Sequence, residues 1–167
     1  RLIYKIGAFA TIFVLAGILL DIVIGTITGG DITSLPKTAI ERFNQLDQNP
    51  LMGLYNMDFL NAIIQLIFIP AYFALFAAHK STSVKWEAKL AFIIFLAGTT
   101  LLVTGNTSLT MLDLSNKFAS ADSESQKMLY AAAGEAMLAR GAHGSLSVLI
   151  GFLLPNISLL QCHLLPP

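Results

Sequence analysis

Two aspartates, Asp21 and Asp58, stand inside long apolar stretches of the sequence. An ionised carboxylate in hydrocarbon costs about 3 kcal/mol or more unless it faces the bundle interior and finds a partner. Two carboxylates at similar depth also repel each other when both are ionised, which favours a shared proton, a bound cation or a basic partner. Lys117 and Arg140 are the basic residues available on the same side. Asp21 and Asp58 are therefore the first candidates for a binding site.

Helical spacing groups further polar residues with these two aspartates. Asp21 shares a helix face with Gly17 and Gly25, and such small residues let a neighbouring helix approach closely. The second apolar stretch carries one polar stripe and the third carries another. The two stripes consist of Asp58, Asn61, Gln65 and Tyr72, and of Thr99, Asn106, Thr110, Asp113 and Lys117. Each of three helices thus presents one polar seam towards the others.

The depths of Asp21, Asp58 and Asn106 agree, because each lies about 10 Å below the predicted outer interface at a rise of about 1.5 Å per residue. We therefore predict a polar layer in the outer half of the bundle that binds a cation, a proton or a small ligand; the metal, if any, is left open. The candidate ligand-binding residues are Asp21, Asp58, Asn61, Asn106, Asp113, Glu135 and Arg140. The alternative is that these side chains only hydrogen-bond neighbouring helices.

The elements that must position these residues are membrane-spanning helices. Of 167 residues, 55% are hydrophobic and 12% are charged, and the mean hydropathy of +0.71 exceeds that of ordinary soluble domains. A helix needs about 20 apolar residues to cross the hydrocarbon core. We predict an all-α integral membrane helical bundle, one transmembrane domain over 1–167, with four transmembrane helices. The predicted spans are 6–27, 51–78, 88–112 and 145–165.

The distribution of basic residues predicts the orientation of the bundle. Cytoplasmic loops of membrane proteins are enriched in Lys and Arg. Such residues dominate the N-terminal stub and the short loop after the second span, where Glu87 is the one acidic residue. They are Arg1, Lys5, Lys80, Lys85 and Lys89. We predict a multi-pass plasma membrane protein with both termini in the cytoplasm.

Two short helices are expected in the longer outer loops. The first covers about 36–47, begins with Ser34-Leu35-Pro36 and carries an apolar stripe, so we expect it to lie flat on the outer membrane surface. That stripe consists of Ala39, Ile40, Phe43 and Leu46. The second covers about 124–140 and follows a capping box formed by Ser123 and Gln126.

Several chemistries lack the residues that they require. Ten basic residues balance ten acidic ones, so we expect no nucleic-acid partner. The single cysteine, Cys162, supports neither an internal disulfide nor a zinc site. The histidines His79, His143 and His163 lie at or beyond the span ends, which disfavours haem, although a His79 and His163 pair stays open. No cofactor is expected.

Several short motifs are distributed along the chain. Positions 106–115 read Asn-Thr-Ser-Leu-Thr-Met-Leu-Asp-Leu-Ser, and positions 132–136 read Ala-Ala-Gly-Glu-Ala. Further pieces are Asn49-Pro50-Leu51, Gly53-Leu54, Asp58, and Pro70-x-Tyr72-x-Ala74-Leu75. Together these motifs resemble a family of bacterial and archaeal multi-pass membrane proteins of unknown function. The resemblance implies a helical bundle in a prokaryotic membrane with no established activity. Four of the motif positions coincide with the outer polar layer predicted above from helical spacing and depth, namely Asp58, Asn106, Asp113 and Glu135.

Three functions fit the sequence. The first is a non-catalytic membrane protein whose outer polar cavity binds a cation, a proton or a small ligand. The second is a structural or accessory subunit of a larger membrane complex, because no catalytic constellation stands out. The third is a membrane enzyme acting on lipid-like substrates with general acids and bases drawn from Asp58, Asp113, Glu135 and His143. The expected partners are membrane lipids, with a homo-oligomer or other membrane subunits as further partners.

Overall fold

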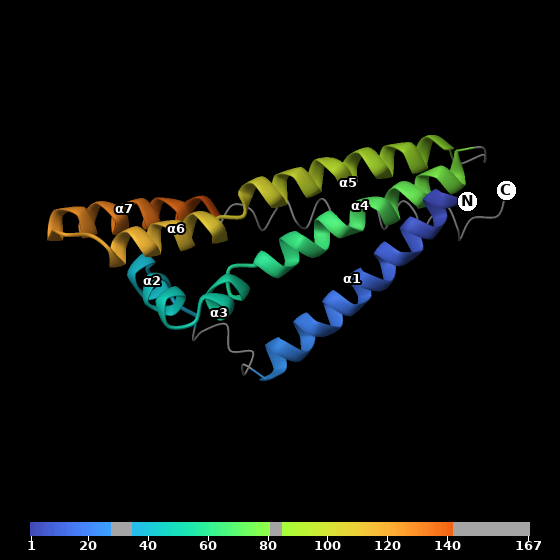
Figure 1. The fold of residues 1–167 in the computed structure, drawn as a ribbon. Coiled ribbons are helices and arrows are strands. Elements are labelled where there is room, and N and C mark those ends of the chain that lie inside the picture. The colour runs from blue at the N-terminus through green and yellow to red at the C-terminus, as the bar shows by residue number, and fades with distance from the viewer. Residues whose placement is uncertain (28–34, 81–84, 142–167) are drawn as a thin grey trace.

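The computed structural model describes residues 1–27, 35–80 and 85–141, and within these ranges the regular structure is entirely helical (Figure 1). The helices are α1 (Leu2–Ile27), α2 (Ala39–Gln48), α3 (Pro50–Tyr55), α4 (Phe59–His79), α5 (Lys85–Gly105), α6 (Ser108–Ala119) and α7 (Glu124–Gly141). Three helical stretches are long and apolar enough to cross a membrane: Leu2–Ile27, Phe59–His79 and Lys85–Ala119. The predicted fourth span, 145–165, lies outside the described residues.

Helices α1, α4 and α5, here called the membrane helices, form the apolar part of the molecule. Helix α4 packs against both α1 and α5, and neighbouring helices run in opposite directions (Figure 1). Gly7 of α1 packs directly on Ala74 of α4, and a Cβ atom added at Gly17 would lie 2.8 Å from Cγ1 of Ile64. The glycine face expected on the first span therefore does face a neighbouring helix, as small residues at membrane helix contacts allow.

The contact between α4 and α5 combines aromatic rings with one polar pair. The rings of Tyr72 and Phe95 stack with centroids 3.8 Å apart and planes 8° apart. Between the same helices, the buried Gln65 donates from Nε2 to Oγ1 of Thr99 over 3.2 Å. Of the polar stripe predicted for the second span, Gln65 and Tyr72 are buried between helices, whereas Asp58 and Asn61 are exposed and do not face inward as predicted. In a low-dielectric interior, the pair of Gln65 and Thr99 satisfies two polar groups that would otherwise be costly to bury.

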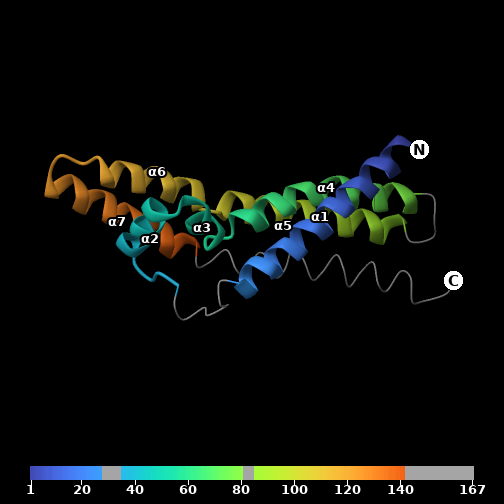
Figure 2. The ribbon, with the colours of Figure 1, turned by 60° about the horizontal axis from the view of Figure 1, so that its bottom comes forward.

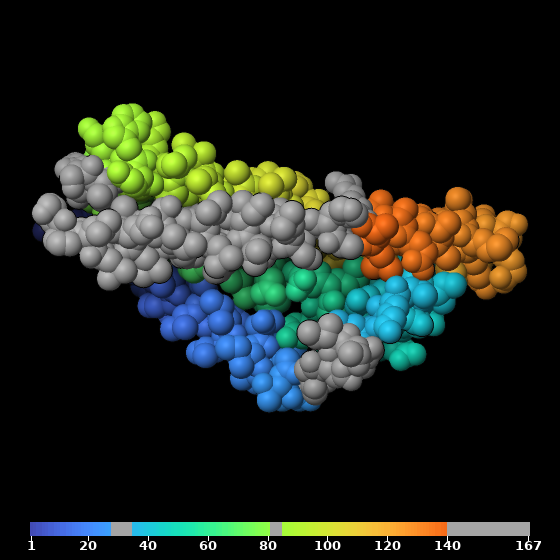
Figure 3. Space-filling model, turned by 180° about the vertical axis from the view of Figure 1, so that it is seen from behind, coloured from blue at the N-terminus to red at the C-terminus, as the bar shows by residue number. Residues whose placement is uncertain are grey.

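Helices α2, α3, α6 and α7, here called the head, gather at the end of the membrane helices opposite the N-terminus (Figures 1 and 2). Helices α6 and α7 form a hairpin, and α2 packs against both of them. The buried core of the head consists of Ala39, Phe43, Leu46 and Met111. Gly134 of α7 permits this contact, because a Cβ atom there would lie 2.7 Å from Cβ of Ala39. Figure 3 shows α7 and α2 in direct contact on the outer surface of the head.

Two of the predicted spans differ from the helices observed. The second, 51–78, is divided, because α3 ends at Tyr55 and the membrane helix α4 begins at Phe59. Asn49-Pro50 begins the short α3, where Oδ1 of Asn49 accepts from the backbone N–H of Met52. The third prediction, 88–112, runs across a break at residues 106–107 that separates α5 from α6.

The first outer helix also differs from its prediction. Helix α2 begins at Ala39, with Thr38 as its N-cap in a capping box with Glu41, three residues beyond Pro36. Its apolar stripe does not lie on a membrane surface, since Phe43 and Leu46 are buried in the head. The α6 and α7 hairpin supplies the apolar partner that this stripe needs. A helix, α7, is found where the second outer helix was predicted at about 124–140, and its position on the outer side stays a prediction.

Candidate functional site

The turn between α3 and α4, residues Tyr55 to Asp58, is the point where the head meets the membrane helices; it is called the junction turn here. The hydroxyl of Tyr55 donates to the backbone oxygen of Asp21 in α1 over 3.0 Å. Burial raises the pKa of Tyr55, and hydrogen bonding with Asp21 and the negative charges of Asp21 and Asp58 act in the same direction. Tyr55 thus fixes α1 to the turn and lies in the field of both predicted aspartates.

The next residue of the turn is bonded to α2. Arg42 donates from Nη1 to the backbone oxygen of Asn56 over 3.2 Å, and the arginine side chain is half-buried. Burial lowers the pKa of Arg42, although the negative charges of Asp58 and Glu41 oppose that effect. Arg42 is therefore a basic neighbour of Asp58. The sequence interpretation instead assigned that role to Lys117 and Arg140; the signal for Arg42 was its place beside the apolar stripe of α2.

The third residue of the turn is bonded to the break between α5 and α6. Asn106 donates from Nδ2 to the backbone oxygen of Met57 over 3.0 Å. Its Oδ1 accepts from the backbone N–H of Ser108 over 3.1 Å and from the Ser108 hydroxyl, at the start of α6. Both polar ends of Asn106 are thus engaged within the chain. This residue ties the turn to the first residues of α6, so its role in the structure is that of a connector.

Asp58, the last residue of the turn, has a left-handed backbone conformation with φ of 59° and ψ of 24°. That conformation costs an L-residue about 1 kcal/mol, although aspartate tolerates it better than most. The Asp58 carboxylate is exposed; it does not cap α4, and Oδ1 accepts from Nδ2 of Asn61 over 3.3 Å. The conformation turns the chain sharply from α3 into α4, and this explains why the predicted second span is divided.

The other predicted site residues lie elsewhere in the head. Asp113 forms an ion pair with Lys117 at 2.6 Å on the exposed side of α6. Glu135 of α7 accepts from the backbone N–H of Ala39 over 2.7 Å at the start of α2. Arg140 belongs to α7, and its side chain lies outside the described part of the structure. Around the junction turn, the structure brings together Asp21, Asp58, Asn61 and Asn106, whereas Asp113 and Glu135 stabilise separate parts of the head.

The chemistry of the junction turn is that of fixed hydrogen bonds and opposing charges. Within residues 1–27, 35–80 and 85–141, no group of three or more His, Cys, Asp and Glu residues has the arrangement to hold a metal ion. No protein-family model, curated protein or solved structure matches the chain. The resemblance to a bacterial and archaeal membrane family therefore stays a prediction.

Proposed function

We propose that this protein is a non-catalytic membrane protein that acts as an accessory subunit of a larger membrane assembly. The membrane helices would anchor it, and the head would meet its partner on the outer side. We further propose a prokaryotic plasma membrane location, a fourth span at 145–165 and both termini in the cytoplasm. The cytoplasmic placement rests on the concentration of basic residues beside the N-terminus and the α4 to α5 connection. The fourth span rests on the apolar run at 145–165, and the prokaryotic location rests on the resemblance described above.

The observation that carries the proposal is the set of bonds made by the junction turn. Three consecutive residues, Tyr55, Asn56 and Met57, are hydrogen-bonded to three different elements: α1, α2 and the α5 to α6 break. A single such bond contributes about 1 kcal/mol. Three bonds to different elements also fix the direction of the head relative to the membrane helices. A fixed head is what a subunit needs to hold a partner in one geometry.

The use of polar groups within the head supports the same proposal. Ser115 donates from its hydroxyl to the backbone oxygen of Phe43 over 3.1 Å, and Glu135 accepts from Ala39. Asn106 is engaged at both ends. Buried polar groups that are satisfied within a chain rigidify it and specify one packing arrangement. Side chains used in this way favour a structural role over ligand binding.

The test is the size of the protein when it is extracted from its native membranes with a mild detergent. We expect a protein mass well above the 18.0 kDa of one chain, measured by size exclusion with light scattering after subtraction of detergent. The double variant Tyr55→Phe/Asn106→Ala should release the single chain while keeping its helix content. As the matched control, Thr104→Ala removes a hydroxyl bonded only within α5 and should leave the large species intact. A wild-type protein that elutes as one chain, even after mild crosslinking, would overturn the proposal.

A second candidate function is binding of a cation or proton by Asp21 and Asp58. It is favoured by the strained backbone of Asp58 and by the effect of both carboxylates on Tyr55. We expect Na⁺, K⁺ or Ca²⁺, or a change of pH, to shift the melting temperature of the wild type. Asp58→Asn and Asp21→Asn should each remove that shift, whereas Asp113→Asn should keep it. An ion and pH response that is identical in all four proteins would exclude this function.

A further inference from the structure

The end of the membrane helices opposite the head carries a concentration of positive charge. Gly7 packs on Ala74 between antiparallel helices, so Arg1, six residues earlier, lies level with Lys80, six residues after Ala74. Figure 1 shows the start of α1 beside the end of α4. The N-terminal residues and the end of α4 therefore form one surface.

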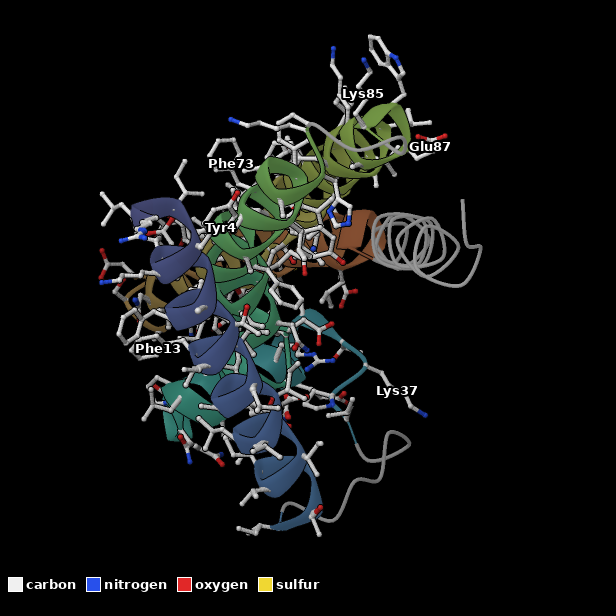
Figure 4. All side chains as sticks on the ribbon, turned by 90° about the vertical axis from the view of Figure 1, so that its right-hand side faces the viewer. Tyr4, Phe13, Lys37, Phe73, Lys85 and Glu87 are labelled. Atoms are coloured by element: carbon white, nitrogen blue, oxygen red, sulfur yellow. The ribbon has the colours of Figure 1, made fainter. Side chains whose placement is uncertain are left out.

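Helix α5 adds further basic residues to this surface. The rings of Phe76 and Phe92 stack with centroids 5.7 Å apart and planes 7° apart. Lys85 precedes Phe92 by seven residues and Lys80 follows Phe76 by four, so both lie beyond this contact at the same end. Figure 4, which looks onto this end, shows Lys85 and Glu87 pointing away from the helices. The basic end is defined here as Arg1, Lys5, Lys80, Lys85 and Lys89, all of which are exposed.

The charge of the basic end is nearly uncompensated. Glu87 is the one acidic side chain among the described residues 1–5, 76–80 and 85–89. The head is different, because its described residues carry more acidic than basic side chains. Like charges that gather at one end are costly unless a counter-charge is present. The uncompensated positive charge therefore favours an anionic partner at this end of the molecule.

Aromatic residues place the basic end at the headgroup level of a bilayer. Trp86 is 66% exposed, and Nζ of Lys89 lies 5.1 Å from the centroid of its ring. Tyr4 is 49% exposed at the start of α1. Tryptophan and tyrosine concentrate at membrane interfaces, where their rings meet the acyl chains and their polar atoms meet the headgroups. A Trp86 ring at that interface would hold the Lys89 ammonium close to the lipid phosphates.

We propose that the basic end is a binding surface for the phosphate groups of anionic phospholipids, such as phosphatidylglycerol. Ammonium and guanidinium groups bind phosphate through charge-assisted hydrogen bonds. Clusters of four to eight Lys or Arg residues beside a membrane helix are typical of anionic lipid recognition. This binding does not depend on whether the head has a protein partner.

Trp86 is the single tryptophan of the chain and lies within the surface, so its fluorescence reports the lipid directly. The full-length protein is reconstituted in phosphatidylcholine vesicles that contain increasing fractions of brominated phosphatidylglycerol or brominated phosphatidylcholine. Bromine quenches tryptophan on contact. We expect half-maximal quenching at a brominated phosphatidylglycerol fraction about fivefold lower than for brominated phosphatidylcholine. Raising NaCl to about 1 M should reduce that preference, because salt screens exposed charges.

The decisive variant is Lys5→Gln/Lys80→Gln/Lys85→Gln, which leaves the Trp86 and Lys89 contact intact. We expect the preference for phosphatidylglycerol to disappear in it. The matched control Lys37→Gln/Lys117→Gln/Lys127→Gln removes the same charge from the head and from the residues just before α2, and it should keep the preference. Equal quenching by the two lipids in the wild type, or an undiminished preference in the first variant, would overturn the proposal. So would loss of the preference in millimolar inorganic phosphate but not in NaCl of equal ionic strength, because that result indicates a site for free phosphate.

Discussion

The membrane helices and the head are held together by different means. Helix α1 meets α4 through Gly7 and Gly17, and most of its other side chains are exposed apolar groups. The head instead buries an apolar stripe of α2. In addition, the side chains of Glu41 and Glu135 accept hydrogen bonds from backbone N–H groups at the start of α2. In lipid, apolar burial drives helices together only weakly, so close backbone contact matters most. In the head, apolar burial is the main stabilising contribution. The comparison indicates that each region can be disrupted without the other.

The largest expected effect comes from removing the central ring of the head. Phe43 is 2% exposed and contacts the ring of Phe118, with centroids 5.3 Å apart. Phe43→Ala should destabilise the head by about 3 to 5 kcal/mol, because it leaves a cavity. Trypsin cleavage at Lys127 in vesicles should then accelerate strongly. The matched variant Phe95→Ala removes a buried ring between α4 and α5 and should leave that cleavage rate unchanged. Equal acceleration in both variants would contradict the independence of the two regions.

The second-largest effect is expected from substitutions at two glycines, one in the head and one in the membrane helices. Gly134→Val places a side chain against Ala39 and Phe43, and we expect it to destabilise the head by about 1 to 3 kcal/mol. Gly7→Val should instead displace α1 from α4. Crosslinking of engineered cysteines between α1 and α4, together with cleavage at Lys127, distinguishes the two outcomes. Gly105→Ala is the control, since a Cβ atom there meets nothing within 4 Å. The comparison fails if Gly7→Val loosens the head as much as Gly134→Val does.

A smaller effect is expected from single bonds of the junction turn. Tyr55→Phe removes the hydroxyl that donates to the Asp21 backbone, which should cost about 1 kcal/mol. Because the lost bond joins the two regions, hydrogen exchange should increase at the α3 to α4 turn and leave the core of the head protected. Tyr130→Phe, which removes the hydroxyl of a half-buried residue of α7, is the comparison variant. Unchanged exchange at residues 55–58 in Tyr55→Phe would show that this bond does not hold the turn.

The smallest effect is a pH dependence confined to the start of α2. Hydrogen bonds from the backbone N–H groups of Lys37 and Thr38 hold the pKa of Glu41 below its usual value near 4.5. A depressed carboxyl pKa stabilises the fold above the usual value, and this contribution is lost as the pH falls through the lowered value. We expect faster amide exchange at Thr38 and Glu41 under these acidic conditions. Glu41→Gln should show the faster exchange at every pH. If amide exchange in the wild type depends on pH in the same way as in Glu41→Gln, the Glu41 carboxylate does not stabilise the start of α2.

The sequence predicted the parts of the fold that depend on local pattern. Helix α7 was predicted from its capping box, α1 from its apolar composition and the inward glycines from helical spacing. The break at Asp58 could not, because apolar residues lie on both sides and the left-handed conformation depends on distant partners such as Arg42 and Asn106. The break after Gly105 had a local signal in Gly105-Asn106, which is typical of turns.

The site shows the same division between local and distant causes. Asp21, Asp58 and Asn106 were expected near one another, and each is linked to the junction turn. The burial of α2 in the head was not expected. An amphipathic stripe fits a membrane surface and a helical partner equally well, so only the position of α6 and α7 decides between them. Arg42 was not predicted as a neighbour of Asp58 for the same reason, because its position follows from the packing of α2 in the head.

The central claim is that the junction turn fixes the head on the membrane helices, and a distance across the turn tests it most directly. Spin labels at Ile93 of α5 and Leu129 of α7, both exposed, are introduced in a Cys162→Ser background. Pulsed electron spin resonance in vesicles should give one narrow distance distribution for the wild-type turn. Tyr55→Phe/Asn106→Ala should broaden it, while the control Thr104→Ala should not. A broad distribution with the intact turn, or one that the double variant leaves narrow, would contradict the account.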